Sequence, residues 1–425
     1  MKNKQFYFGC LICAIGALFY CYEFILRIIP GALQGELSAA FGHISASTYG
    51  QLSAFYYFAY APMQLPVGML MDRLGPRRLL TFACLCCVLG SAMFSYSTSM
   101  LIIGAGRFLV GFGSAFAFVG VLSLALHWLP RRYFSLVAGL ITTLSMLGLV
   151  YGEIKITEMA ISFGLNSVLT LMIIIGVVLT ALIFFIVRDN VDGNDIRKTT
   201  PPLPEFFRIV RQVLTSPAVW LFGVIGACLY TSLSVFGELW GKSYLEQAHH
   251  LTKVEAAQTI SAMFLGWAVG APIAGYWSDR SGKRVFPLVL GAILSLMCIS
   301  LVLYYPGLSY LSLNILLFLY GVFSATEIIV FVMAKETTGA KLSGTVFAAV
   351  NMIVTLGGVI FQPLVGYLLD TFGNNRIVHG EHIYTVVDYQ LALSILPLSL
   401  LMVIILAFFI KSASNSALEE SRLSH

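Results

Sequence analysis

Two oppositely charged residues, Glu23 and Arg27, lie four positions apart inside a long apolar run near the start of the chain. On a helix, this spacing places both side chains on one face. A charge inside a bilayer costs on the order of 2.5–3.5 kcal/mol, so such residues require partners or a water-filled cavity. Arg27 could clamp a carboxylate through its planar guanidinium, and Glu23 could meet a cation or a proton. A structural ion pair between the two is the alternative.

Other apolar runs also contain charged residues. Arg107 lies at a depth that the first run reaches near Glu23, so these two side chains could pair. Glu238 lies toward the outer end of a later run, whereas Lys155 and Lys242 are expected at a solvated rim. The substrate-binding candidates are therefore Tyr22, Glu23, Arg27, Arg107 and Glu238.

An acidic residue without a basic neighbour is suited to carry a proton across a membrane. Glu327 has no basic residue within one helical turn, and its run is expected to line the interior. Burial without a partner favours the neutral, protonated form of a carboxyl group. The sequence therefore predicts proton coupling at Glu327, with Glu23 and Glu153 as alternative sites.

The composition identifies the class of protein that must position these residues. Of the 425 residues, 58% are hydrophobic and 11% are charged, against roughly a quarter charged in soluble proteins. The apolar runs are long and continuous, which predicts membrane-spanning helices rather than barrel strands. The seven histidines form no HExxH motif, and Cys10 and Cys13 lack a second cysteine pair. We therefore expect no metal site and no cofactor.

The apolar runs divide six and six around one polar stretch. We expect an all-α membrane protein of about twelve transmembrane helices, in two six-helix bundles related by a pseudo-two-fold axis along the membrane normal. The predicted domains are an N-terminal bundle over 1–190, a cytoplasmic linker over 191–216 and a C-terminal bundle over 217–425. The expected spans are 6–34, 46–71, 79–96, 99–127, 133–157, 164–187, 217–242, 253–277, 285–305, 309–334, 343–369 and 386–410.

The basic residues indicate how the chain lies in the membrane. Most of the 25 lysines and arginines fall on the side that holds both chain ends and the linker. The positive-inside rule then predicts a multi-pass protein of the plasma (inner) membrane with both termini in the cytoplasm. This asymmetry accounts for the net charge of +5, so we expect no nucleic-acid partner. The expected partners of this monomer are a small-molecule substrate, membrane lipid and, if transport is coupled, protons.

A short motif recurs at equivalent positions of the two halves. The pattern Gly-x-x-x-Asp-Arg-x-Gly runs from Gly68 to Gly75 and again from Gly275 to Gly282. Its glycines permit close helix approach and a tight turn, and its aspartate can face a helix N-terminus. The alternative is that the basic residues here only determine topology. The candidate gating residues are Gly68, Asp72, Arg73, Gly75, Arg77, Asp279 and Arg280.

These motifs resemble those of the major facilitator superfamily of secondary transporters, over essentially the whole chain. The loop from Gly68 to Arg78 matches the family signature Gly-x-Leu-x-Asp-Arg-x-Gly-x-Arg-Arg, and the segment from Gly106 to Gly113 resembles a second family motif. The resemblance implies alternating access, in which two bundles rock about a central site lined by the first, fourth, seventh and tenth spans. The first span and the segment from Phe236 to Leu245 are similar to the branch that contains the lysosomal dipeptide transporter.

We therefore expect a secondary transporter, not an enzyme, that takes up an amino acid, a short peptide or an organic anion. Charges of both signs on the cavity spans suit a zwitterion or an anion better than a neutral sugar. Coupling of this uptake to protons, as symport, is left open. The alternatives are proton-driven efflux of drugs or metabolites, which the lack of a Gly-Pro motif in span 133–157 disfavours, and a non-transporting membrane sensor.

Overall fold

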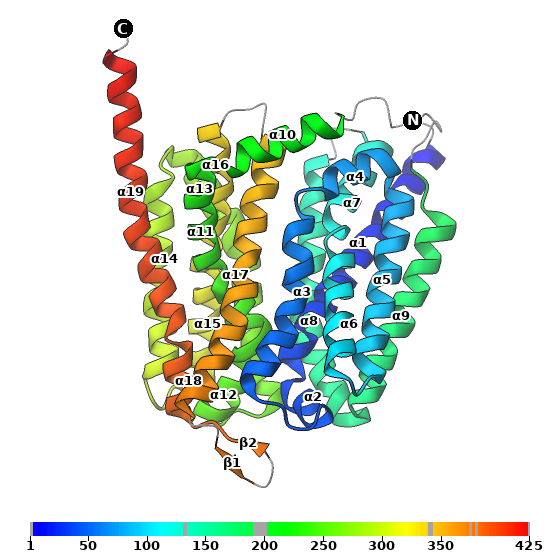
Figure 1. Ribbon diagram of the computed structural model, residues 1–425, viewed down its shortest axis with the longest axis vertical. Helices are drawn as coiled ribbons and strands as arrows, with labels where there is room; N and C mark the ends of the chain where they lie inside the picture. Colours follow the sequence, from blue (N-terminus) through cyan, green and yellow to red (C-terminus); the bar gives the residue numbers. More distant parts are fainter. Residues whose placement is uncertain are drawn as a thin grey trace.

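The computed structural model describes residues 3–130, 134–189, 202–338, 343–373, 376–378 and 381–423. Helices dominate these ranges, and the strands β1 (Ile377–Val378) and β2 (Glu381–His382) form one small antiparallel hairpin. Figure 1 shows two bundles side by side, with both chain ends and helix α10 at one face. We call this the terminal face, and we call the opposite face, which bears the strands, the hairpin face.

The N-terminal half forms the first bundle. Its helices are α1 (Asn3–Ala32), α2 (Gln34–Ala40), α3 (Ala46–Met63), α4 (Val67–Leu74), α5 (Pro76–Tyr96), α6 (Met100–Ser114), α7 (Ala117–Trp128), α8 (Phe134–Phe163) and α9 (Leu165–Ile186). The expected linker contains a further helix, α10 (Leu203–Leu214), and its residues 191–201 lie outside the described ranges.

The C-terminal half forms the second bundle. Its helices are α11 (Pro217–Thr231), a π-helix (Ser232–Trp240), α12 (Gly241–His249), α13 (Lys253–Ser281), α14 (Val285–Tyr304), α15 (Tyr310–Ser324), a 3₁₀ turn (Ala325–Glu327), α16 (Ile328–Thr338), α17 (Ser343–Phe372), α18 (Val386–Leu393) and α19 (Ile395–Leu423). The domain boundaries at 190 and 217 stay a prediction.

Eleven segments of the described chain are long and apolar enough to cross a membrane. The expected span 46–71 corresponds to α3 and α4, which a break at Gln64–Pro66 separates. It is less apolar because α3 directs tyrosines such as Tyr49, Tyr56 and Tyr57 into the protein interior. The all-helical membrane fold in two bundles is therefore confirmed, with one helix less apolar than the other spans.

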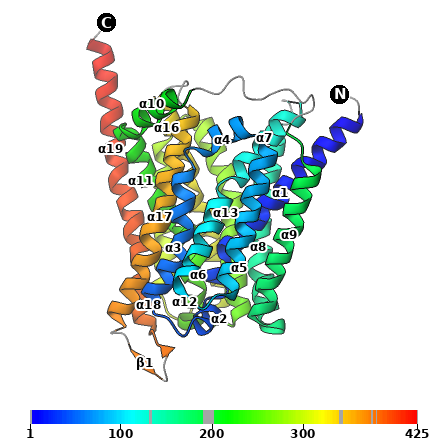
Figure 2. The same ribbon diagram turned by 45° about the vertical axis from the view of Figure 1, so that its right-hand side comes forward.

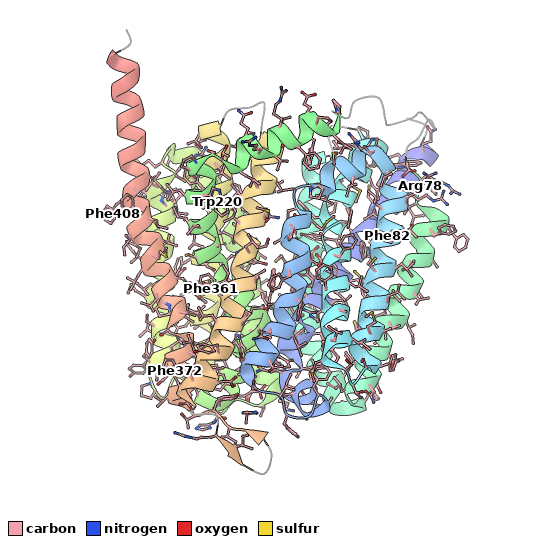
Figure 3. All side chains as sticks on the ribbon, in the orientation of Figure 1. Arg78, Phe82, Trp220, Phe361, Phe372 and Phe408 are labelled. Atoms are coloured by element: carbon pink, nitrogen blue, oxygen red, sulfur yellow. The ribbon has the colours of Figure 1, made fainter. Side chains whose placement is uncertain are left out.

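The outside of the bundles is apolar, as a lipid-facing surface requires. Phe82, Trp220 and Phe408 are exposed, and Figure 3 labels Phe408 at the edge of the molecule and the other two on one bundle each. Because water would not cover these rings in a membrane, their exposure is consistent with contact to acyl chains and head groups.

The two halves approach closely toward the hairpin face. Figure 2 shows α3 beside α17, and these helices pack along each other. Close approach requires glycine at several positions. A Cβ atom at Gly31, for example, would lie 2.2 Å from the carbonyl oxygen of Glu238. A Cβ atom at Gly366 would likewise lie 2.2 Å from the carbonyl oxygen of Ala46. Backbone therefore meets backbone across the interface between the halves.

Polar bonds also join the halves at the hairpin face. The carboxylate of Asp370, near the end of α17, accepts the backbone N–H groups of Ala46 and Ser47 at 3.1 and 2.9 Å. These N–H groups begin α3, so a side chain of one half caps a helix of the other. Lys253 and Glu36 form an ion pair of 2.5 Å between α13 and α2. The structure therefore represents a state in which the hairpin face is closed.

Candidate functional site

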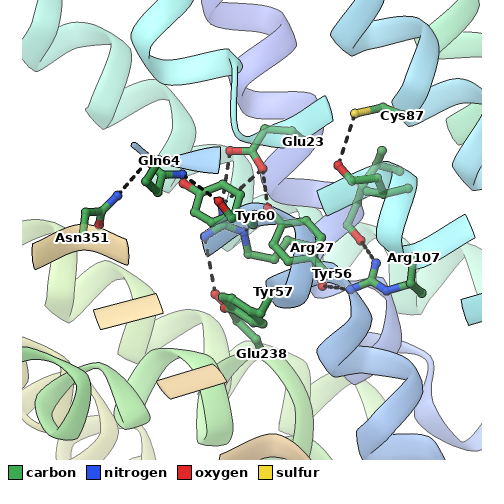
Figure 4. Close-up of polar contacts among 12 residues, drawn as sticks. Glu23, Arg27, Tyr56, Tyr57, Tyr60, Gln64, Cys87, Arg107, Glu238 and Asn351 are labelled. Carbon is green, nitrogen blue, oxygen red and sulfur yellow. Dashed lines mark hydrogen bonds and ion pairs between the residues drawn. The ribbon is translucent and has the colours of Figure 1, made fainter. Parts of the chain in front are cut away.

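Arg27 of α1 lies at the centre of a polar network between the two halves (Figure 4). Its Nε donates to the hydroxyl of Tyr56 at 2.9 Å, and its Nη1 donates to the hydroxyl of Tyr230 at 3.3 Å. Its Nη2 lies 3.3 Å from Oε2 of Glu23, and its Nη1 lies 3.9 Å from Oε1 of Glu238. One guanidinium thus contacts carboxylates of both halves.

Tyrosine hydroxyls complete the network. Tyr57 donates a hydrogen bond to Glu238, and its hydroxyl lies 3.4 Å from that of Tyr230. Tyr56 donates to Glu23 at 3.1 Å, and Tyr230 donates to Glu238 at 3.5 Å. Tyr56 and Tyr57 belong to α3, whereas Tyr230 and Glu238 belong to α11 and the π-helix. Every bond from α1 or α3 to Tyr230 or Glu238 therefore crosses from one half to the other.

Because these charged side chains are buried, the electrostatic interactions between them are strong. The exposed fractions are 0% for Glu23 and 4% for both Arg27 and Glu238. The Arg27 guanidinium carbon also lies 4.4 Å from the ring centre of Phe24 and 4.9 Å from that of Tyr60. Aromatic faces stabilise a cation when water is excluded. The positive charge is thus held by rings as well as by carboxylates.

The bonds from the terminal nitrogens of Arg27 are long. Nη1 and Nη2 reach Tyr230 and Glu23 at 3.3–3.4 Å, whereas charge-assisted hydrogen bonds are typically about 2.7–2.9 Å. The shorter bond of Nε to Tyr56 orients the guanidinium. The outer edge of the guanidinium is therefore suited to exchange its present acceptors for an incoming carboxylate, which it can bind at two points.

Arg107 of α6 lies next to this site and binds the backbone of α1. Its guanidinium donates to the backbone carbonyl oxygens of Leu26 and Arg27 at 3.0 and 3.5 Å and lies 5.2 Å from the ring centre of Tyr56. It therefore contacts the backbone of α1 instead of the carboxylate of Glu23, the pairing expected from depth alone. The reason is that α1 presents carbonyl groups to α6 while Glu23 faces α3.

The two remaining substrate-binding candidates, Glu238 and Tyr22, lie in different places. Glu238 lies within the network, whereas the hydroxyl of Tyr22 donates to the carbonyl of Met172 on α9, inside the N-terminal half. Sequence reasoning missed the tyrosines that do line the network. The available signal was the group Tyr56, Tyr57 and Tyr60 within a single helical turn of an otherwise apolar run.

Two acids of the proton-coupling set are buried apart from Arg27. Glu153 of α8 and Glu327 of the 3₁₀ turn are 1% and 5% exposed. Each has one carboxylate oxygen without a hydrogen-bond partner among the described residues. Lys155 is exposed and pairs with Glu158, as expected of a rim. The expectation for Lys242 is wrong, because its side chain is buried between the halves.

The first copy of the repeated motif forms a turn at the terminal face. Gly75 has φ of +82°, and a Cβ atom there would lie 2.8 Å from the Asp189 carboxylate, so only glycine suits this position. The backbone N–H of Arg77 donates to Asp189 at 2.8 Å, and its guanidinium donates to the carbonyl of Phe184. Asp72 is exposed, Arg73 is half-buried, and the space beside Gly68 is open.

The second copy repeats the turn with different partners. Gly282 has φ of +64°, and Arg284 donates to Asp279 at 2.5 Å and to Glu336 at 2.8 Å. The hydrogen bonds to Glu336 and Asp279 raise the pKa of Arg284. Arg280 is exposed. The geometry brings each motif to the terminal face, and its gating role stays a prediction.

The described residues contain no group of three or more His, Cys, Asp or Glu side chains that could hold a metal ion. The groups present at the central network, Arg27 with its carboxylates and tyrosines, can reversibly bind charged and hydrogen-bonding groups.

Comparisons with known proteins match this architecture. The family described as Major Facilitator Superfamily matches residues 11–362. The lysosomal dipeptide transporter of Danio rerio is 23% identical over 381 residues, which cover 85% of this chain and 80% of that protein. The probable sulfoacetate transporter of Cupriavidus necator is 21% identical over 387 residues, with 86% and 88% covered.

A solved structure has the same fold. A bacterial homolog to the human lysosomal transporter Spinster, in an inward-facing and unoccupied conformation, superposes with a TM-score of 0.77 at 15% identity. The superposition covers 99% of this chain and 98% of that chain.

Proposed function

The chain belongs to the Major Facilitator Superfamily, and from this premise we propose that it transports a small organic solute bearing a carboxylate group. The solute binds between the halves at Arg27, and the halves then alternate in opening toward the two faces. Amino acids, short peptides and organic anions all present the required group.

The position of Arg27 is the observation that carries this proposal. Its guanidinium is buried at the interface of the two halves, and its terminal nitrogens hold Glu23 and Tyr230 by long bonds. A solute carboxylate can take over these bonds as a bidentate ligand. The released carboxylates of Glu23 and Glu238 are then available to an amino group, which favours a zwitterion such as a dipeptide.

The similar proteins support the same chemical class. One is named for dipeptides and the other for sulfoacetate. These solutes differ in their second charged group, an amine in one and a sulfonate in the other. A carboxylate is the group that they share, and it is the group that suits Arg27.

Direction and coupling are further parts of the proposal. The basic residues of the terminal face support a cytoplasmic position for that face in a plasma (inner) membrane. Solute then enters from the hairpin face together with protons, which Glu327 carries as a buried acid. Proton-driven efflux from the terminal side is the alternative direction, and a sensor would bind the solute without moving it.

Binding measurements on the purified protein test this function. We expect dipeptides or sulfoacetate to raise the melting temperature, because a ligand of the folded state stabilises it, and we expect dipeptide amides to have no effect. Arg27→Lys should weaken binding at least about tenfold, or ~1.4 kcal/mol, because an ammonium cannot replace the planar fork.

The matched control is Arg208→Lys on α10, whose side chain is 77% exposed and far from the network. This variant should bind like the wild type. Equal binding of the carboxylate and the amide, or full affinity in both Arg27→Lys and Arg27→Gln, would contradict the proposed site.

A further inference from the structure

Lys242 of α12 reaches from the C-terminal half into the N-terminal half near the hairpin face. Its ammonium donates to the carbonyl of Ala32, the last residue of α1, and to the hydroxyl of Thr157 on α8 at 2.9 Å. The last carbonyl groups of a helix lack helical partners and carry its negative dipole end. The N-terminal half therefore provides a binding place for this cation, which is 5% exposed.

Glu153 lies one helical turn before Thr157, on the same face of α8. It is 1% exposed, and its Oε2 atom has no hydrogen-bond partner within the described ranges. The charged groups that act on this carboxyl are Lys242 and, with opposite effect, Glu246, both on α12. Lys242, whose ammonium donates to Thr157 one turn away, is therefore the oppositely charged group that acts on Glu153 in the closed state.

Among the described residues, Lys242 and Glu246 are the charged groups that act on the Glu153 carboxyl, and the contacts beside it from other elements are apolar or neutral. From α1, the apolar side chains of Ile25 and Ile28 lie beside Gly152. From α13, Ser261 donates its hydroxyl hydrogen to the carbonyl of Val150 at 2.9 Å. The electrostatic environment of Glu153 is thus set by a residue of the opposite half, and it changes when the halves separate.

We infer that Glu153 and Lys242 form a proton-sensitive lock of the hairpin face. When the halves separate there, Lys242 leaves with the C-terminal half, and the uncompensated carboxylate of Glu153 takes up a proton from that side. When Lys242 returns as the face closes, the Glu153 carboxyl releases this proton to the water of the same side. By linkage, protonation of Glu153 weakens the attraction for Lys242 and favours opening to the same extent. This inference rests on the alternating access of the proposed function.

Glu327 provides a comparison within the same chain. It is also buried with an unpartnered carboxylate oxygen, but its turn packs on α11, α13 and α14, helices of its own half. Separation of the halves leaves these neighbours in place. A proton at Glu327 can be carried, whereas a proton at Glu153 also changes how tightly the hairpin face closes.

The test is the distance between the halves as a function of pH, without solute. Spin labels at Thr98 and Tyr305, exposed residues of the α5–α6 and α14–α15 loops, report the opening of the hairpin face in protein whose natural cysteines are replaced. We expect the ratio of open to closed molecules to rise about fivefold or more from pH 8 to pH 5.5. Glu153→Gln should lose most of this dependence.

Three further variants complete the experiment. Lys242→Gln should be open in a larger fraction at every pH and lose the pH dependence, whereas Lys242→Arg should retain it. Glu158→Gln, the matched control on α8, whose side chain is 39% exposed, should respond to pH like the wild type. A wild-type response in Glu153→Gln overturns the lock, even if Lys242→Gln fails to fold. Carboxylate binding at Arg27 is measured separately, so failure of the lock and failure of the proposed function are distinguishable.

Discussion

The guanidinium of Arg27 shares a buried site with two carboxylates, and burying these charges lowers the stability of the folded protein. Removing charges from water costs several kcal/mol per ion, and apolar residues of similar volume often stabilise a protein as well or better. Removal of one partner leaves the others uncompensated. Conservative variants such as Arg27→Lys therefore test binding more cleanly than Arg27→Ala.

Glu327 allows a prediction about energy coupling at the same scale. Glu327→Gln keeps the shape of this buried side chain but removes its titratable proton. We expect proteoliposomes with this variant to lose solute accumulation driven by a pH gradient, because a neutral side chain carries no proton. Exchange of solute between equal pools should stay within about twofold of the wild type.

The control is Glu158→Gln, which removes an acid that is 39% exposed at the rim of α8. It should accumulate solute like the wild type. If Glu327→Gln still concentrates solute against its gradient, the proton passes through Glu153 or Glu23 instead.

Residues of the site could be predicted from the sequence where their spacing along one helix determines their contact. Glu23 and Arg27 are one turn apart, and in the structure they form the ion pair that is one of the two interpretations of this spacing. Tyr57 and Tyr230 were missed, because a tyrosine in an apolar run can equally well pack in a hydrophobic core. Lys242 was wrongly expected at a solvated rim. Its distance from the end of a span does not reveal that residues of the opposite half bury it.

At the scale of elements, the contact of α3 with α17 determines whether the hairpin face can close. Gly366 meets the backbone of Ala46, and Asp370, one turn further along α17, caps the start of α3. Backbone contact and cap lie on the same side of α17. A side chain inserted at this point would separate the two helices.

We therefore predict opposite effects of one substitution at two positions of α17. Gly366→Ala should weaken the closed hairpin face by about 1–3 kcal/mol, because its Cβ atom would lie 2.2 Å from a backbone oxygen. Gly344→Ala, where nothing lies within 4 Å, should be neutral or stabilise the helix by about 0.5–1 kcal/mol. Melting temperature and the distance between labels at Thr98 and Tyr305 measure both effects. Equal behaviour of the two variants would mean that this contact does not limit closure.

The sequence predicts the existence of the elements better than their internal form. The π-helix Ser232–Trp240 positions Glu238, yet an apolar run looks the same in α and π geometry. Helix α10 was missed because Pro201, Pro202 and Pro204 suggest a linker. Proline is tolerated in the first helical turn, where its missing N–H has no helical acceptor, and α10 begins in this way.

At the scale of the whole molecule, several contacts of different kinds close the hairpin face together. Asp370 caps α3, Lys242 binds the end of α1, and Lys253 of α13 pairs with Glu36 of α2. Each contact joins one half to the other. Alternating access requires that all of them break in the same transition, so a covalent bond at any one of them should hold the molecule in the present state.

The ion pair of Glu36 and Lys253 allows this bond to be made without mutation. Burial alone would raise the pKa of Glu36, but its hydrogen bond from Lys253 outweighs this effect and lowers the pKa. The carboxylate is therefore ionised at neutral pH, and the pair weakens only as pH falls through this lowered pKa. With the two groups 2.5 Å apart, a zero-length carbodiimide reagent should join them as an amide.

We predict that this cross-link abolishes transport while binding of the carboxylate solute from the terminal face persists. The cross-linked peptide is identified by mass spectrometry, and transport is measured in proteoliposomes before and after reaction. Lys253→Gln cannot form the bond, so its transport should survive the reagent; it controls for modification of other carboxylates. Transport that continues in fully cross-linked wild-type protein would show that the halves need not separate at the hairpin face.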